Sequence, residues 1–325
     1  MASKKYNLLM AGALMLLATG AFAQSGSGYD VYDSSVISSK RMPQQNEFWN
    51  NSYNFPAKPR NMWEIGISAG NFSVNGDVTS RIPSLGFAAH VRKAFGYVFS
   101  MRLQYLYGTA KGLNWTASQN FGKNEAWTNN GYVPGQFVYY NYKNKTQDLS
   151  LQGIFTLNNI RFHKNKSGVV FYVGAGAGAT AYEVMVNALR EDGSNYSALF
   201  NSIPLATEYK DRKDILDALK DGMDDSYETP AQNQGARRPK LGDNTLRFST
   251  TVLGGVAFKL GKRINLALEN RHTFIKDDLL DGQQWQENPG GDAALTGNWD
   301  SYNYLSLGLN FNLGAKSVEP LWWLN

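Results

Sequence analysis

The sequence predicts an all-β fold: an eight-stranded antiparallel β-barrel that crosses a membrane and carries long loops on one side. Three observations predict it. Apolar and polar residues alternate with a period of two in eight separate rows, the connections between rows are short and long in turn, and no apolar run after residue 23 is long enough for a membrane helix. A helix needs about 20 apolar residues to cross a bilayer, whereas a strand needs about 9–11. A membrane protein of this kind must close its strands into a barrel, because lipid cannot satisfy an exposed sheet edge.

Composition excludes several classes of protein. The 325 residues include no cysteine and three histidines, which excludes a disulfide scaffold, a thiolate zinc site and a catalytic cysteine. The formal net charge is +5; without Lys4 and Lys5 of the leader, 30 basic and 27 acidic residues remain, or +3. Since no stripe dense in lysine and arginine is present, we expect no nucleic-acid partner. We also expect no cofactor and no bound metal.

Residues 1–23 are typical of a secretory signal peptide. Lys4 and Lys5 precede a short apolar run, Leu8–Ala18, and Ala21-Phe22-Ala23 matches the small-x-small cleavage pattern. A membrane anchor is the alternative, but the run is too short for one. Residues 24–61 are polar and contain three prolines, so we expect a periplasmic linker or a strap that binds a partner.

The barrel is predicted over residues 62–314. Its first row places Trp63, Ile65 and Ile67 on one face and Glu64 and Ser68 on the other. A soluble barrel or sandwich would alternate in the same way but with its apolar face inward. Charged residues in the middle of the second faces favour the membrane. Aromatic residues near the row ends predict an interfacial girdle: Trp63, Tyr97, Tyr105, Tyr107, Tyr172, Tyr182, Tyr302 and Tyr304. The other seven rows lie at 85–91, 99–107, 149–157, 171–179, 246–252, 264–271 and 305–313.

The connections predict which side of the membrane each end faces. Long loops are expected at 109–146, 183–244 and 275–300, whereas the intervening turns are short, and one further connection, Val74–Ser80, is brief. Short periplasmic turns and long external loops are typical of outer-membrane barrels. We therefore expect the bacterial outer membrane as the location.

The second faces of the rows predict a lumen that contains charges. The interior of an eight-stranded barrel is filled by side chains or holds one small ligand. Buried charges need partners, so we predict an ion-pair network in the lumen. Its predicted members are Glu64, Arg92, Arg102, Arg247, Glu269 and Arg271. His90, Gln104, Gln152 and Asn310 share the same faces. A plugged lumen and a narrow gate or pore are the two alternatives.

The long loops are the candidate contact surfaces. Loop 109–146 is rich in aromatic residues and asparagine, which suit contact with a protein or a glycan; the alternative is that the rings pack on one another and on lipopolysaccharide. Loop 183–244 is too long to lack structure. It contains a predicted helix at 211–221 with an apolar stripe, and an acidic run over 221–228 that is a weak calcium candidate or a solvated turn. The predicted contact residues are Trp115, Trp127, Tyr139, Tyr140, Ile215, Leu216 and Leu219.

Catalysis is not expected. His272 lies close in sequence to Asp277 and Asp278, but its parity matches Leu266 and Leu268, which are predicted to face lipid. No nucleophile and base can be paired from the sequence.

The last row and the tail carry a family resemblance. Ser306, Gly308, Phe311 and Leu313 resemble the signal by which the bacterial barrel-assembly machinery recognises a terminal strand. The tail at 317–325, SVEPLWWLN, resembles the junction after the barrel in outer membrane protein A-like proteins of the Bacteroidota. In that family a calcium-binding linker and a peptidoglycan-binding domain usually follow, so residues 315–325 are interpreted as the start of a periplasmic linker.

The resemblance implies a non-enzymatic barrel that anchors or docks cell-envelope components. The implied forms are a tether to peptidoglycan, if a further domain follows, and an accessory subunit of outer-membrane assembly or type IX secretion complexes. The implied partners are outer-membrane lipid and lipopolysaccharide, the barrel-assembly machinery during insertion, and other envelope proteins. A narrow channel or small-solute porin is the alternative.

Overall fold

The structure, a computed structural model, describes residues 34–57, 63–160, 168–231, 238–261, 263–284 and 298–313. The predicted signal peptide and the tail that carries the family resemblance lie outside these residues.

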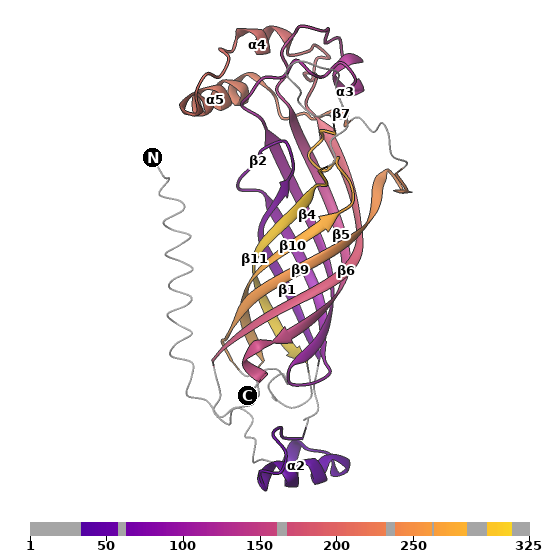
Figure 1. The fold of residues 1–325 in the computed structure, drawn as a ribbon, viewed down its shortest axis with the longest axis vertical. Helices are drawn as coiled ribbons and strands as arrows, with labels where there is room; N and C mark the ends of the chain where they lie inside the picture. Colours follow the sequence, from indigo (N-terminus) through magenta and orange to yellow (C-terminus); the bar gives the residue numbers. More distant parts are fainter. Residues whose placement is uncertain are drawn as a thin grey trace.

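Eight long strands form a closed antiparallel barrel (Figure 1). Strands adjacent in sequence pair with each other, and β1 pairs with β11 to close the barrel. This confirms the predicted fold class. Three two-residue strands extend the wall at one end: β2 (Ser80–Arg81), β7 (Thr229–Pro230) and β8 (Lys240–Leu241). The long strands are β1 (Trp63–Asn75), β3 (Leu85–Ala94), β4 (Phe99–Leu113), β5 (Asn141–Thr156), β6 (Val169–Val186), β9 (Asn244–Lys259), β10 (Ile264–Ile275) and β11 (Ser301–Leu313).

Several strands continue beyond the predicted rows, so the loops are shorter than expected. The pairing of β4 with β5 continues to Leu113 opposite Asn141, and the loops run over 114–140, 187–243 and 276–300. The added parts carry outward lysines such as Lys111, Lys143 and Lys145 instead of apolar residues. Hydrophobic periodicity therefore fails to mark them.

The helices lie at the two ends of the barrel (Figure 1). The end with α3 (Glu125–Thr128), α4 (Ser197–Ser202) and α5 (Arg212–Gly222) is called the loop end, and the opposite end, beyond which α2 (Met42–Trp49) lies, is called the turn end. Helix α5 confirms the helix predicted at 211–221. In the described parts of the chain, no helix is both long and apolar enough to cross a membrane.

The alternation of side chains across the wall is as predicted. Ile67, Leu85 and Phe171 are 54–64% exposed on the outside, whereas Gln104 and Gln152 are buried inside. Successive residues of a strand point to opposite faces, so apolar side chains cover the outside and polar ones fill the inside.

The predicted aromatic girdle is partly wrong. Trp63, Tyr105 and Tyr107 are exposed on the outer wall, but the five other aromatic residues are buried: Tyr97, Tyr172, Tyr182, Tyr302 and Tyr304. The strand tyrosines among these five have the parity of the inward-facing residues, as Tyr172 does with Gly174 and Gly176 on β6. Nearness to the end of a row therefore does not predict exposure on the outside, because the odd or even position of a residue in its strand decides whether it points inward or outward.

The segment before the barrel docks on the turn end. The Tyr97 hydroxyl donates to the carbonyl of Pro56 over 3.0 Å, and the Tyr97 ring stacks on Phe55 with centroids 5.6 Å apart. The amide of Ala57 donates to the buried Gln45 side chain over 2.9 Å. Residues 42–57 are therefore an ordered cover beside the turn after β3, more structured than the predicted linker.

Candidate functional site: the lumen and the loop domain

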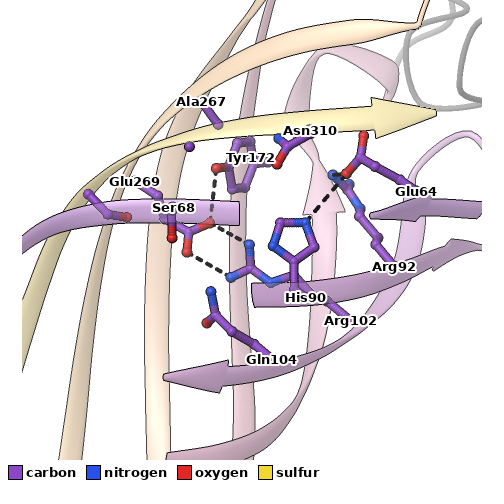
Figure 2. Close-up of a pocket in the computed structure, with 12 residues that line it drawn as sticks. Glu64, Ser68, His90, Arg92, Arg102, Gln104, Tyr172, Ala267, Glu269 and Asn310 are labelled. Atoms are coloured by element: carbon purple, nitrogen blue, oxygen red, sulfur yellow. Dashed lines mark hydrogen bonds and ion pairs between the residues drawn. The ribbon is translucent and has the colours of Figure 1, made fainter. Parts of the chain in front are cut away.

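A bidentate ion pair lies in the middle of the lumen (Figure 2). The Arg102 guanidinium, from β4, donates to both carboxylate oxygens of Glu269, from β10, over 2.8 and 2.7 Å. Tyr172 donates its hydroxyl to the same carboxylate over 2.9 Å, and Arg102 Nε donates to Gln152 over 2.7 Å. Charge-assisted bidentate bonds of this kind are strong and fix orientation.

A second ion pair lies nearer the loop end. Arg271 is fully buried and donates to the carboxylate of Asp148, to Gln104 over 3.1 Å and to Thr251 over 3.0 Å. Asp148 also accepts from Thr180 over 2.9 Å. Asp148 is not among the lumen charges predicted from the sequence, although its parity on β5 matches that of the inward residue Gln152.

The third group lies toward the turn end and is more loosely paired. Glu64 is 3.8 Å from both Arg92 Nη1 and His90 Nε2, and it accepts from Asn265 over 3.2 Å. Gly66 leaves the space that His90 occupies, because a Cβ there would lie 2.4 Å from His90 Cε1. Five of the six predicted lumen charges thus lie in paired positions inside the barrel.

The sixth, Arg247, lies elsewhere. Its Nε is 2.7 Å from Asp277 at the loop end, where Arg238 and Tyr182 also bind that carboxylate. The prediction that Arg247 joins the network of Glu64 and Glu269 is therefore wrong. Arg247 lies three residues from the first residue of β9, at the loop end, so its side chain reaches the rim of the barrel.

Little free space remains around the central charges. The cavity between Glu64, His90, Arg102 and Glu269 has about 20 Å³ of free volume, which is room for about one water molecule. In the described barrel, this part of the lumen is filled by side chains.

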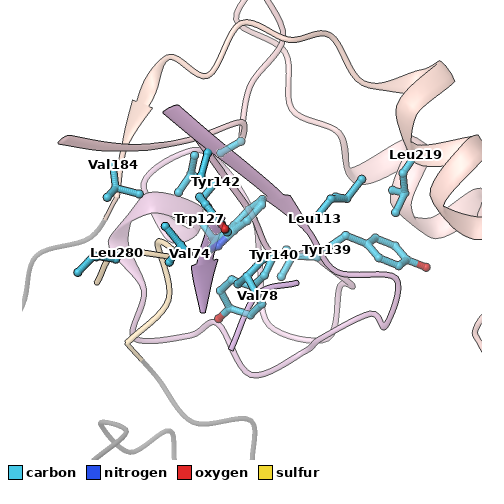
Figure 3. Packing of buried hydrophobic residues seen from close by; sticks show 14 of the residues in the cluster. Val74, Val78, Leu113, Trp127, Tyr139, Tyr140, Tyr142, Val184, Leu219 and Leu280 are labelled. Atoms are coloured by element: carbon cyan, nitrogen blue, oxygen red, sulfur yellow. The ribbon is translucent and has the colours of Figure 1, made fainter. Parts of the chain in front are cut away.

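The aromatic residues of loop 114–140 form the core of a folded loop domain (Figure 3). Trp127 and Tyr139 are fully buried and Tyr140 is nearly so, and the Trp127 and Tyr132 rings meet edge to face at 5.1 Å. Phe200 of α4 packs against the same rings. Of the two sequence-based alternatives, the structure has the rings packing on one another.

The predicted stripe of α5 belongs to the same core. Ile215 and Leu219 are buried in it and Leu216 packs against it. Most of the predicted contact residues are thus inside the loop domain and cannot touch a partner directly. Trp115 remains partly accessible, with the 69% exposed Tyr209 at 6.0 Å from its ring.

The acidic run at 221–228 is held by hydrogen bonds. Asp224 accepts from the amides of Glu191 and Ser226 over 3.0 and 3.1 Å. Although burial opposes ionisation, hydrogen bonds from Ser226, Tyr196 and these amides lower the pKa of Asp224 to about 2. Among the described residues, no group of three or more carboxylate or histidine side chains is arranged to hold a metal ion.

The remaining sequence candidates lie on the outer wall. His272 is outward, as predicted, with its ring 4.6 Å from that of Phe274. In the terminal strand β11, Phe311 and Leu313 are exposed outside, whereas Ser306 and Gly308 face inward. Their role as an assembly signal stays a prediction.

The side chains thus define a closed β-barrel with an apolar outside and an ion-paired inside. Neither a protein-family model nor a curated protein matches the sequence. Neisserial surface protein A is similar in structure, with 11% identity over 77% of this chain and 97% of its own, at a TM-score of 0.35. Ail of Yersinia pestis, solved with a heparin analogue, has 9% identity over 78% of this chain and 99% of its own, at 0.34. A major outer membrane protein of Thermus thermophilus has 9% identity over 77% of this chain and 99% of its own, at 0.37.

Proposed function

We propose that this chain is a non-enzymatic outer-membrane β-barrel that anchors or docks cell-envelope components. The observation that carries the proposal is the reversed distribution of side chains, with leucine and phenylalanine rows outside and buried ion pairs inside. Monomeric soluble proteins rarely expose contiguous apolar patches larger than about 300–600 Å². The short turns and the docked segment 42–57 then lie in the periplasm, and the loop domain lies outside the cell.

Closure of the lumen favours docking over transport. The bidentate Arg102–Glu269 pair and the fully buried Arg271 lie across the path that a solute would take. The folded loop domain covers one end, and it offers a structured surface to a partner. The resemblance of the tail at 317–325 to outer membrane protein A-like proteins supports the anchoring form, in which a further domain would hold peptidoglycan.

Conductance tests closure directly. We expect the purified barrel, reconstituted in planar bilayers, to show no steady channel, and the same for Glu269→Gln and for its outward-facing control Glu183→Gln. Discrete conductance that changes with Glu269→Gln but not with Glu183→Gln would favour the narrow-channel alternative and contradict the docking proposal.

Docking is tested by removing the loop domain. Loops 114–140 and 187–243 share one core, so both should be replaced by short linkers. We expect the shortened protein to keep heat-modifiable migration, which reports barrel folding, and to lose the envelope proteins that cross-link to the full chain. If the same proteins still cross-link, the loop domain is not the docking surface.

A further inference from the structure

Three cationic side chains lie next to one another on the outer wall near the loop end. Arg81 of β2 is the register partner of Lys111 of β4, which is in turn the partner of Lys143 of β5. By the alternation of β4 and β5, Lys111 and Lys143 share the outward face with Tyr107. Like charges opposite each other on adjacent strands destabilise a sheet. We therefore expect a bound anion to neutralise this basic row, Arg81–Lys111–Lys143.

The described residues supply little of that charge. Asp225 reaches Lys111 over 3.1 Å, but its side chain is 70% exposed, so the pair contributes little. No carboxylate of the described chain forms an ion pair with Arg81 or Lys143. In contrast, Lys145, the next outward residue of β5, pairs with Glu183 at 3.0 Å.

Tyr227 covers the basic row. Its ring centroid lies 5.2 Å from Lys111 Nζ and 5.7 Å from Lys143 Nζ, and its hydroxyl interacts with Arg81. The backbone of Tyr227 has φ +51°, a left-handed conformation that is uncommon for an aromatic residue. Such strain persists only when the surroundings enforce it, and it concentrates at binding sites.

A pocket of about 230 Å³ opens beside the row. Arg81, Lys220 of α5 and Tyr227 line it together with the carboxylates of Asp224 and Asp225, whereas Lys111 and Lys143 lie outside its lining. Typical small-molecule pockets measure about 300–1,000 Å³, so the volume of this one matches a single sugar unit.

The height of the basic row above the membrane fits an anionic lipid headgroup. Lys111 lies four residues beyond Tyr107, which is about 14 Å along the strand. Tyr105 and Tyr107 are exposed on the outer wall at the level expected for the interfacial girdle. The basic row therefore lies where the headgroups of outer-leaflet lipids lie.

We propose that Arg81, Lys111 and Lys143, covered by Tyr227, bind a phosphoryl group carried on a sugar, as in the headgroup of an outer-leaflet glycolipid. The inference rests on the proposed outer-membrane location. A phosphoryl group offers three anionic oxygens to neighbouring donors and a charge of about −1.5 to −2, whereas a carboxylate offers two oxygens and a single charge. It competes with the exposed Asp225 for Lys111.

The test measures retained lipid by native mass spectrometry. The full chain is placed in phosphatidylcholine nanodiscs that contain diphosphoryl lipid A or its dephosphorylated form. We expect retention of the diphosphoryl form only, a loss of about tenfold or more in the Arg81→Gln/Lys143→Gln double variant, and little change in the matched control Lys145→Gln. Retention that ignores the phosphates, or that falls equally in the control, would overturn the proposal.

A second measurement separates binding from folding. Removing two like charges should leave the double variant at least as stable as the native barrel toward urea, while it loses the lipid. Loss of both stability and retention would indicate a structural role and overturn the proposal. Heat-modifiable migration is measured in every variant, because it reports whether the barrel has folded. A variant that keeps this migration but does not retain lipid speaks against the proposed site and not against the barrel.

A soluble arm distinguishes the two sources of the ligand. Glucosamine 1-phosphate is titrated into the detergent-solubilised protein by calorimetry. Binding with the same dependence on Arg81 and Lys143 shows that the site takes the free phosphorylated sugar, and lipid A retention without it shows that the site takes the lipid headgroup. Absence of both overturns the proposal.

Discussion

Single buried charges decide the behaviour of the lumen. Arg102 and Glu269 are 167 residues apart in sequence and meet in a water-poor interior. Taking two charges out of water is costly, so such a pair contributes modestly, but removing one partner leaves an uncompensated charge. We therefore expect the pair to hold the barrel in one arrangement more than it adds stability.

The first stability prediction follows from that asymmetry. Arg102→Met should lower the free energy of unfolding by about 3–5 kcal/mol, because it leaves the Glu269 carboxylate buried without its cationic partner. The double variant Arg102→Met/Glu269→Leu should recover most of the loss. Urea unfolding in lipid vesicles, followed by tryptophan fluorescence, measures both. The exposed ion pair between Lys145 and Glu183 gives the control, since Glu183→Gln should lower the free energy of unfolding by only about 0–1 kcal/mol. A double variant as unstable as the single one would contradict the asymmetry.

Parity predicted which residues face inward but not which ones meet. Glu64, Arg102, Glu269 and Arg271 are buried as expected. The partner of Arg271 is the unpredicted Asp148, because contacts across the lumen depend on strand tilt and shear, which the sequence does not show.

At the scale of elements, two loops fold as one unit. Helix α5 was predictable from its apolar stripe, but the partner of that stripe is the aromatic core of another loop, far away in sequence. Loop residues of mixed polarity have no period that predicts such a contact. The same residues that suggested a contact surface turned out to be the interior.

Trp127 is the natural test of this unit. Trp127→Ala should destabilise the loop domain by about 3–5 kcal/mol, because it empties a fully buried site. We expect rapid proteolysis within 114–140 and 187–243, with the barrel still heat-modifiable. The exposed Tyr209→Ala should change the cleavage rate little. Equal cleavage in the two variants would show that the loops do not share a core.

At the scale of the whole molecule, aspartates gather at the loop end, where we predict that stability depends on pH. Asp281 and Asp300 are buried, and one carboxylate oxygen of each lies within 2.5 Å of the place where a Cβ on Gly76 would be. Burial raises the pKa of both, and repulsion from Asp281 raises that of Asp300 further. Burial, with repulsion from Asp281 and Asp77, also raises the pKa of Asp278 to about 7.

The sign of the pH effect follows from these raised values. A carboxyl whose pKa is higher when folded than when unfolded adds stability at low pH, and that stability is lost as pH rises from about 4 through the folded value. The loop end should therefore be more protected at pH 5 than at pH 8. Asp300→Asn should flatten this difference, and the exposed Asp243→Asn should not. Hydrogen exchange over 76–84 and 277–284, corrected for intrinsic rates, measures the difference in protection between the two pH values. Equal protection at pH 5 and pH 8 would contradict the raised pKa values of these aspartates.

The seam between β1 and β11 limits when the barrel can close. Their register runs from Trp63 opposite Leu313 to Asn75 opposite Ser301, so the first strand finds one of its two neighbours only after the last has been synthesised. Until then, the sheet has two open edges at β1 and β11. Closure of the barrel is thus the last pairing step, and it requires the whole stretch from Trp63 to Leu313 to have been synthesised.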